Sequence, residues 1–204
     1  MRPPFNIDKE LAENTYDVII ISIPAMEIHD KAGNIAQGTR HPLARVGAAV
    51  VVKEGAPVPD VSTPEKLKAA VLAAKSITHT DPVTPNTSGA VAGAAFTKLG
   101  ILEQVRSKTR YAPLAVGGKL VADGEIEMGI FNISEVPKGA VAAGPLPGDL
   151  QSYTACESAV LAEGSRDEAA TAYAKYLGSA GTAAIWEASK LEPATSYQPA
   201  GVSR

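Results

Sequence analysis

Apolar runs of strand length alternate with helix-forming segments along almost the whole chain. The first run, residues 16–22 (YDVIIIS), is continuous, as in a strand that is buried on both faces. Residues 45–55 (RVGAAVVVKEG) form a second run that is rich in valine. Residues 62–74 (STPEKLKAAVLAA) then form a helix, with Ser or Thr as its cap and Pro64 in its first turn. This alternation predicts an α/β fold whose sheets are mainly parallel.

One stretch, residues 78–100 (THTDPVTPNTSGAVAGAAFTKLG), passes from a polar loop directly into a run of small apolar residues. The pattern predicts a short strand within residues 75–80 and a helix over about 88–99 that ends at Gly100. Free backbone N–H groups at such a helix start attract anions, although an ordinary capped helix explains the same residues.

Composition excludes several classes of protein and site. The formal net charge is −3, the pI is near 5.7 and aromatic residues make up 5% of the chain, which argues against nucleic-acid binding. No apolar run reaches the roughly 20 residues that cross a bilayer. A single cysteine, Cys156, excludes an intramolecular disulfide and a cysteine-rich metal site. Neither a metal nor a cofactor is expected. Residues 1–14 lack the apolar core of a signal peptide.

Four segments, taken in order, carry a resemblance to a known family. They are residues 41–89 (HPLARV to TSG), 121–136 (VADGEIEMGIFNISEV), 144–154 (GPLPGDLQSYT) and 167–177 (DEAATAYAKYL). Together they resemble the molybdate-type periplasmic substrate-binding proteins of ABC transporters, a family that also takes other small oxyanions and organic anions. The resemblance covers about residues 8–193.

The resemblance implies a two-lobed periplasmic-binding-protein fold of type II. Residues 1–50 and 155–204 are expected to form lobe 1, and residues 51–154 to form lobe 2, with the ligand in the cleft between them. It also implies a periplasmic monomer that binds a small anion and delivers it to an ABC transporter permease.

The start of the chain departs from the family pattern. The first strands and helices of lobe 1 have no counterpart in the sequence, so lobe 1 is expected to be N-terminally truncated. Val18, Ile19 and Ile21 are then expected to be exposed along an unpaired sheet edge, and lobe 1 to be weakened.

The resemblance also implies which residues contact the anion. Uncharged N–H and O–H donors can bind an oxyanion without a paired cation. Each candidate also has a structural interpretation, as a helix cap, a turn glycine or a core tyrosine. The candidate ligand-binding residues are Thr87, Ser88, Gly89, Gly117, Gly118, Asn132 and Tyr153.

Arg and Lys side chains at the site would distinguish a polycarboxylate ligand from a tetrahedral oxyanion. A polycarboxylate usually binds to the fork of an arginine guanidinium group, whereas a tetrahedral oxyanion does not need one. Each available cation is also a candidate for an ordinary solvated surface charge. The available cations are Arg40, Arg45, Lys108, Arg110 and Lys119.

Three functions stay open at this point. The sequence contains no nucleophile elbow, P-loop or metal-binding histidine pair, which favours an anion receptor over an enzyme. The second is an isomerase of the aconitate isomerase type, a relative of this fold, with His79 as the general base. The third is a truncated remnant that binds nothing.

Overall fold

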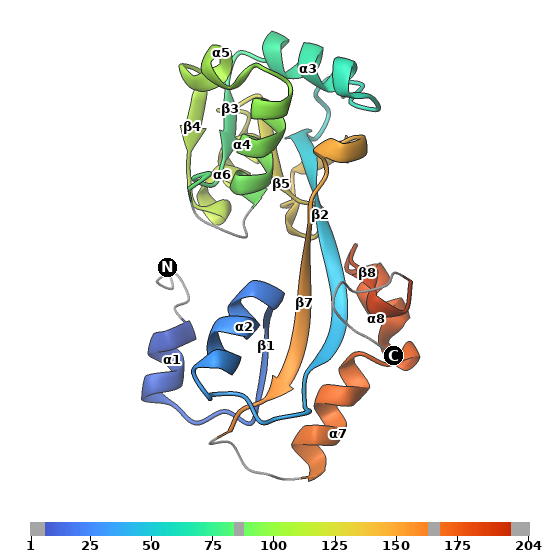
Figure 1. Ribbon diagram of the computed structural model, residues 1–204. Coiled ribbons are helices and arrows are strands. Elements are labelled where there is room, and N and C mark those ends of the chain that lie inside the picture. Colours follow the sequence, from blue (N-terminus) through green and yellow to red (C-terminus); the bar gives the residue numbers. More distant parts are fainter. Residues whose placement is uncertain (1–6, 84–87, 163–167, 197–204) are drawn as a thin grey trace. The chain divides into compact units, whose positions relative to one another are not determined.

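The computed structural model describes residues 7–83, 88–162 and 168–196. These residues fall into two compact units, with boundaries between Arg45 and Val46 and between Thr154 and Ala155. Residues Ser189–Leu191 are grouped with the second unit. Strands β2 (His41–Lys53) and β7 (Tyr153–Val160) run through these boundaries, so each contributes residues to both units (Figure 1).

The first unit combines a short antiparallel sheet with helices on both of its faces. Its sheet is made by β1, by β8 and by the parts of β2 and β7 that belong to it. Its elements are α1 (Ile7–Glu13), β1 (Val18–Ser22), α2 (Ile23–Lys31), α7 (Glu168–Leu177), α8 (Ala183–Ala188) and β8 (Glu192–Pro193).

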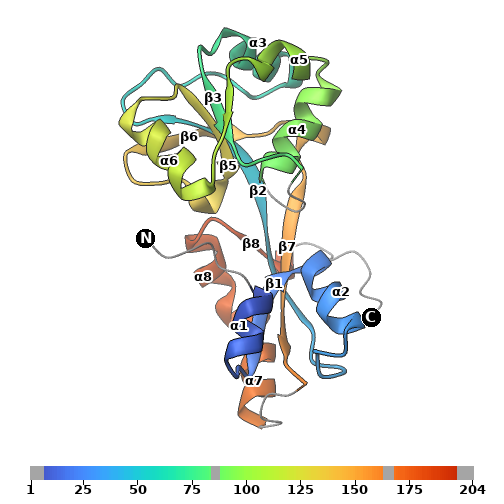
Figure 2. The same ribbon diagram turned by 90° about the vertical axis from the view of Figure 1, so that its left-hand side faces the viewer.

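Strand β1 pairs antiparallel with β7, with Ile20 opposite Ser158. Its burial alternates: Ile19 and Ile21 are buried, whereas Ile20 is 48% exposed. The expected exposure of Ile19 and Ile21 is therefore wrong, and Val18 is half-buried. The physical reason is the packing of α1 and α2, whose apolar side chains join Ile19 and Ile21 in one cluster. Figures 1 and 2 show α1 beside β1, on the side opposite β7, where it covers the end of the sheet.

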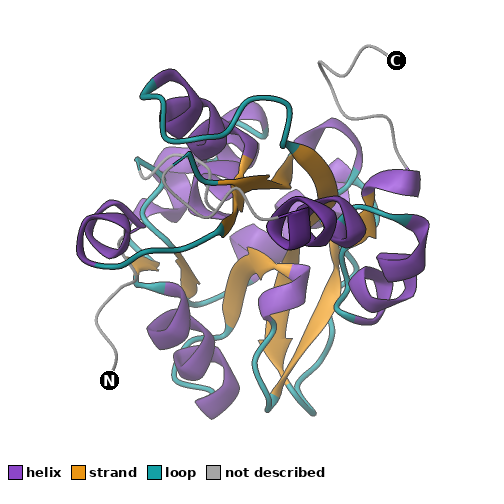
Figure 3. Cartoon of the chain, turned by 90° about the horizontal axis from the view of Figure 1, so that it is seen from below, coloured by secondary structure: helices purple, strands orange, loops and turns teal. Residues whose placement is uncertain are grey.

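The second unit is a sheet with helices on both faces. The helices and strands of this unit are α3 (Pro64–Ala73), β3 (Ile77–His79), α4 (Ser88–Lys98), α5 (Leu102–Arg106), β4 (Thr109–Tyr111), α6 (Leu114–Asp123), β5 (Met128–Asn132) and β6 (Ala140–Pro145), with the 3-10 turns η1 (Ile133–Glu135) and η2 (Gly148–Leu150). Figure 3 shows the helices and strands of the chain coloured by type.

The α/β fold class is confirmed, but the prediction of mainly parallel sheets is wrong. Strand β3 is parallel to β4 and to β5, whereas β2 is antiparallel to β5, β6 and β8. Parallel neighbours need a crossover, usually a helix. Helices α4 to α6 supply such crossovers for β3, β4 and β5 alone.

Two apolar cores hold the second unit together. The larger core lies under α3, α4 and α5 and includes Leu67, Phe96 and Ile130. The smaller core lies under α6 and includes Val121 and Phe131. Figure 2 shows α4 and α6 on opposite sides of β3, so both faces of this strand are covered.

Candidate functional site

The carboxyl ends of β3, β4 and β5 meet at one edge of the second unit. Parallel pairing places Thr78 beside Arg110 and also beside Gly129, so the segments that follow these three strands emerge together. We call this place the C-terminal edge; it comprises Thr80–Asp81, the start of α4, the start of α6, and Asn132 with η1. Ligands of open α/β sheets gather at such an edge.

At the C-terminal edge, α4 begins with Ser88, which is buried, and Gly89. The N–H of Gly89 donates to Thr80 Oγ1 at 2.9 Å. This N–H group was predicted to bind the anion, but in the structure it is already paired with the Thr80 hydroxyl. A Cβ on Gly89 would lie 2.0 Å from the carbonyl oxygen of Thr80, and only glycine permits this approach. Thr87 lies outside the described residues.

The two glycines of α6 lie inside the helix, because the helix begins at Leu114, before the glycine pair that was expected to open it. A Cβ on Gly117 would lie 3.2 Å from the Phe131 ring and from Thr78 Oγ1. A Cβ on Gly118 would lie 3.2 Å from Pro137. Close packing of α6 on the sheet thus accounts for both glycines, and ligand contact by them stays a prediction.

Asn132 and Tyr153 approach the same short stretch of β2. Asn132 ends β5 and pairs with Ala48, and a Cβ on Gly47 would lie 3.2 Å from the Tyr153 ring. In this stretch of β2, the Gln151 amide accepts from the N–H of Ala48 at 3.0 Å and donates to its carbonyl at 2.8 Å. Tyr153 is 43% exposed, so it is not the buried core tyrosine of the structural interpretation.

Two polar groups near this edge were missed by the sequence analysis. Thr78 is fully buried, and its Oγ1 has no hydrogen-bond partner among the residues that the structure describes. Glu135 keeps exposed surface, but packing around its carboxyl group raises its pKa, and hydrogen bonds from Asn132 partly offset the rise. A Thr inside a strand and a Glu in a 3-10 turn carry no sequence signal of their own.

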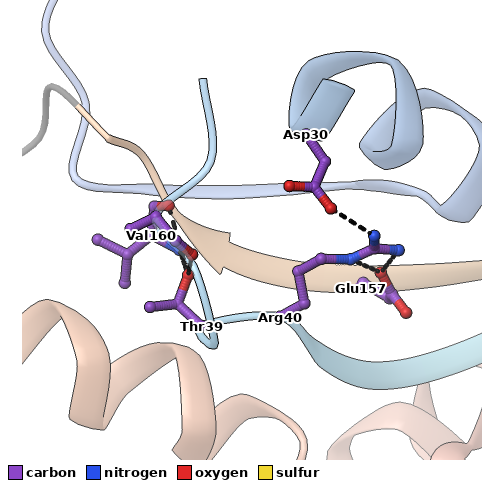
Figure 4. Close-up of polar contacts among 6 residues, drawn as sticks. Asp30, Thr39, Arg40, Glu157 and Val160 are labelled. Carbon is purple, nitrogen blue, oxygen red and sulfur yellow. Dashed lines mark hydrogen bonds and ion pairs between the residues drawn. The ribbon is translucent and has the colours of Figure 1, made fainter. Parts of the chain in front are cut away.

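The candidate cations are largely engaged within the protein. In the first unit, Arg40 donates to Glu157 at 2.7 and 2.9 Å and to Asp30 at 2.9 Å, beside the hydrogen bond from the Val160 N–H to Thr39 (Figure 4). Arg45 pairs with Glu192 at 2.7 Å.

In the second unit, Lys108 donates to three carbonyl oxygens at the end of α3, and Lys119 pairs with Asp123 on α6. Arg110 is exposed on β4 and makes no ion pair with the other described residues.

His79 is buried at the end of β3, with 2% of its surface exposed. Burial lowers its pKa, and a hydrogen bond between Nδ1 and the Thr80 carbonyl oxygen, together with the charge of Asp81, partly offsets the shift. A neutral imidazole at pH 7 is the form that a general base needs. However, the ring packs against Phe96 and Tyr111, on the side of the sheet that carries α4.

Two negative findings apply to the described residues only. Within ranges 7–83, 88–162 and 168–196, no group of three or more His, Cys, Asp or Glu side chains is placed to hold a metal ion. No helix in these same ranges has the length and apolar character that a membrane span requires.

Comparison with known proteins identifies the family. The model of the bacterial extracellular solute-binding protein family matches residues 3–189, so the chain belongs to this family. The resemblance to molybdate-type substrate-binding proteins is confirmed.

Two curated relatives match the sequence. The chain is 29% identical over 194 residues to an aconitate isomerase of a Pseudomonas species, which covers 93% of this chain and 72% of the relative. It is 33% identical over 115 residues to the molybdate-binding protein ModA of Azotobacter vinelandii, which covers 53% of this chain and 46% of that protein.

Solved structures share the fold. The substrate-binding domain of a putative molybdenum ABC transporter from Clostridium difficile has a TM-score of 0.74 at 14% identity, covering 91% of this chain and 81% of its own. The periplasmic molybdate-binding protein of Azotobacter vinelandii has a TM-score of 0.67 at 16% identity, covering 90% of this chain and 81% of its own. These values support the periplasmic-binding-protein fold class.

Proposed function

We propose that this protein binds a small oxyanion or organic anion at the C-terminal edge of its second unit and serves as the solute receptor of an ABC transporter. The observation that carries the proposal is the family match over residues 3–189. The molybdate-binding relative and the molybdate-binding structure point to an anion as the solute. Membership of this family also supports the proposal that the protein delivers its solute to a permease from the periplasm.

The chemistry of the edge favours a tetrahedral oxyanion over a polycarboxylate. At this edge, buried Ser88 and partly exposed Asn132 are uncharged groups, as is exposed Tyr153, which lies against Gly47 of β2; uncharged donors suffice for an oxyanion. A polycarboxylate would use an arginine fork, and Arg40 and Arg45 are already paired with carboxylates. Arg110 is the described arginine that stays available in the second unit.

Thermal unfolding in the presence of single anions tests this proposal. A ligand at 100 times its Kd stabilises the folded state by about 2.7 kcal/mol, which raises Tm by roughly 5–10 °C in a protein of this size. At least one of molybdate, tungstate and sulfate is expected to raise Tm by this amount. Trans-aconitate and citrate are expected to raise Tm by less. A chain that binds nothing would show no shift with any of them.

Matched variants then test the edge itself. Ser88→Ala removes one hydroxyl donor and is expected to weaken binding about five- to tenfold. Ser107→Ala, an exposed serine at the end of α5, is the control and is expected to leave affinity unchanged. If both variants bind like the parent, the anion does not lie at Ser88.

A second candidate function is isomerisation of a tricarboxylate, which the match over 194 residues to an aconitate isomerase favours. In that case trans-aconitate added to the protein is converted, and NMR of the substrate shows the product directly. His79→Gln is expected to abolish turnover if His79 is the base. Binding of trans-aconitate without conversion would leave receptor function as the answer.

A further inference from the structure

A concavity lies in the second unit, where α4 and α5 meet β4. It has a volume of ≈ 540 Å³ and is lined by residues of β3, α4, α5 and β4. The α4 residues that line it include Ala90, Gly93 and Ala94, whose small size leaves it room. This space holds a bicyclic aromatic molecule with ease, because ligand pockets start at about 300 Å³.

The inner wall of this pocket is aromatic. The His79 ring lies 5.1 Å from the Tyr111 ring and 5.8 Å from the Phe96 ring, centroid to centroid. All three residues line the pocket, where Tyr111 is 47% exposed and His79 and Phe96 lie almost fully buried behind it. Aromatic walls favour a planar apolar guest, which stacks or meets their edges.

The polar atoms of the wall are mostly acceptors. The Thr80 carbonyl can only accept, so the proton of neutral His79 is on Nδ1, 2.7 Å from that oxygen, and Nε2 carries a lone pair. Among the described residues, the ring has no other hydrogen-bond partner. Thr97 and Thr109 donate their hydroxyl hydrogens to main-chain carbonyls at 2.8 Å, so they too offer lone pairs to the pocket.

The rim carries one charge of each sign. Arg106 and Glu103 lie 3.5 Å apart, and both are largely exposed. Since the two charges offset each other, the pocket favours a neutral guest over an anion or a cation. This separates it from the C-terminal edge, where donors and not acceptors are expected to hold the ligand.

We propose that this pocket binds a small, neutral, planar molecule that carries an N–H donor, with its ring against Tyr111 and its N–H directed at His79 Nε2. Indole has this chemistry and serves as the probe. The matched probe 1-methylindole has nearly the same size and apolar surface but no N–H.

Amide NMR titrations of the isotope-labelled protein with each probe test the proposal. Indole is expected to give saturable shifts confined to α4, α5 and β4. 1-Methylindole is expected to bind about tenfold more weakly, because a buried acceptor is then left unpaired. Equal affinity for the two probes, or no saturable shift with indole, would overturn the proposal.

A pair of alanine substitutions locates the site. Ala94→Phe fills the pocket from an exposed position on α4 and is expected to reduce indole affinity at least about tenfold. Ala69→Phe, on the exposed side of α3, is the control and is expected to have no effect. Unchanged binding by Ala94→Phe would place indole elsewhere and refute the assignment. Molybdate and trans-aconitate are expected not to compete with indole, and competition by either would also refute it.

Discussion

Lys108 is expected to hold the end of α3 to the sheet, and replacing it with methionine tests how much this contributes. Its Nζ donates to the carbonyl oxygens of Val71 at 3.0 Å, Leu72 at 2.6 Å and Ala74 at 2.7 Å. These carbonyls end the helix and have no intrahelical partner, and the ammonium group also lies at the negative end of the helix dipole.

The expected loss follows from these contacts. Hydrogen bonds with a charged donor contribute about 1.5–3 kcal/mol each in isolation, but the three share one ammonium group whose desolvation and ordering oppose them. We therefore expect Lys108→Met, which keeps most of the apolar stem, to destabilise the second unit by about 2–3 kcal/mol. In a protein of this size the corresponding decrease in Tm is roughly 5–10 °C.

Lys75→Met is the matched control. Lys75 is exposed and lies just beyond the same helix end, so it shares the position relative to the dipole but makes none of the three side-chain bonds. Its replacement is expected to change Tm by less than about 1 °C. Calorimetry or circular dichroism melting of both variants decides the matter. If Lys108→Met melts within a degree of the parent, the three contacts do not stabilise the fold, contrary to this prediction.

Three further predictions concern stability. Gly89→Ala is expected to lower the free energy of unfolding by about 2–3 kcal/mol, because the new Cβ would lie 2.0 Å from the Thr80 carbonyl oxygen. Gly181→Ala is the control, because the nearest atom to its Cβ is 3.5 Å away. Similar urea midpoints for the two variants would contradict this prediction. Glu157→Gln is expected to lower the free energy of unfolding by about 1–2 kcal/mol, because it removes the negative charge beside Arg40. The control Glu187→Gln, at an exposed position, is expected to lower it by under about 0.5 kcal/mol. Double-mutant cycles with Arg40 measure the coupling between Arg40 and Glu157. Burial lowers the pKa of His79, so the unfolded chain takes up the proton more readily than the folded chain. The contribution of neutral His79 to the free energy of unfolding is therefore fully present well above pH 6.5 and decreases as the pH falls below 6.5. His79→Gln is expected to flatten this dependence in urea titrations between pH 7.5 and 5, and an unchanged slope would exclude His79 as its source.

The covering of β1 shows how much depends on tertiary packing. The apolar run at residues 16–22 correctly predicts a strand, but its continuity suggested burial on both faces. In the structure the faces differ, since Ile19 and Ile21 are buried and Ile20 is exposed. Only the folded chain shows that α1 lies beside this strand, because the packing of two segments is not encoded in the pattern of either one.

The same distinction applies to the candidate site. Caps, prolines and glycines act over a few residues, so the sequence alone placed α3, α4 and β3 and, through several weak motifs in order, the family. It could not show that Thr80 takes the Gly89 N–H, that Gly117 makes room for Phe131, or that Tyr153 and Asn132 approach the same stretch of β2. Those relations join atoms that are distant in sequence or depend on side-chain direction, and they are fixed only when helices pack on the sheet. Local propensity therefore determined the elements, and tertiary packing decided which polar groups remain available to a ligand.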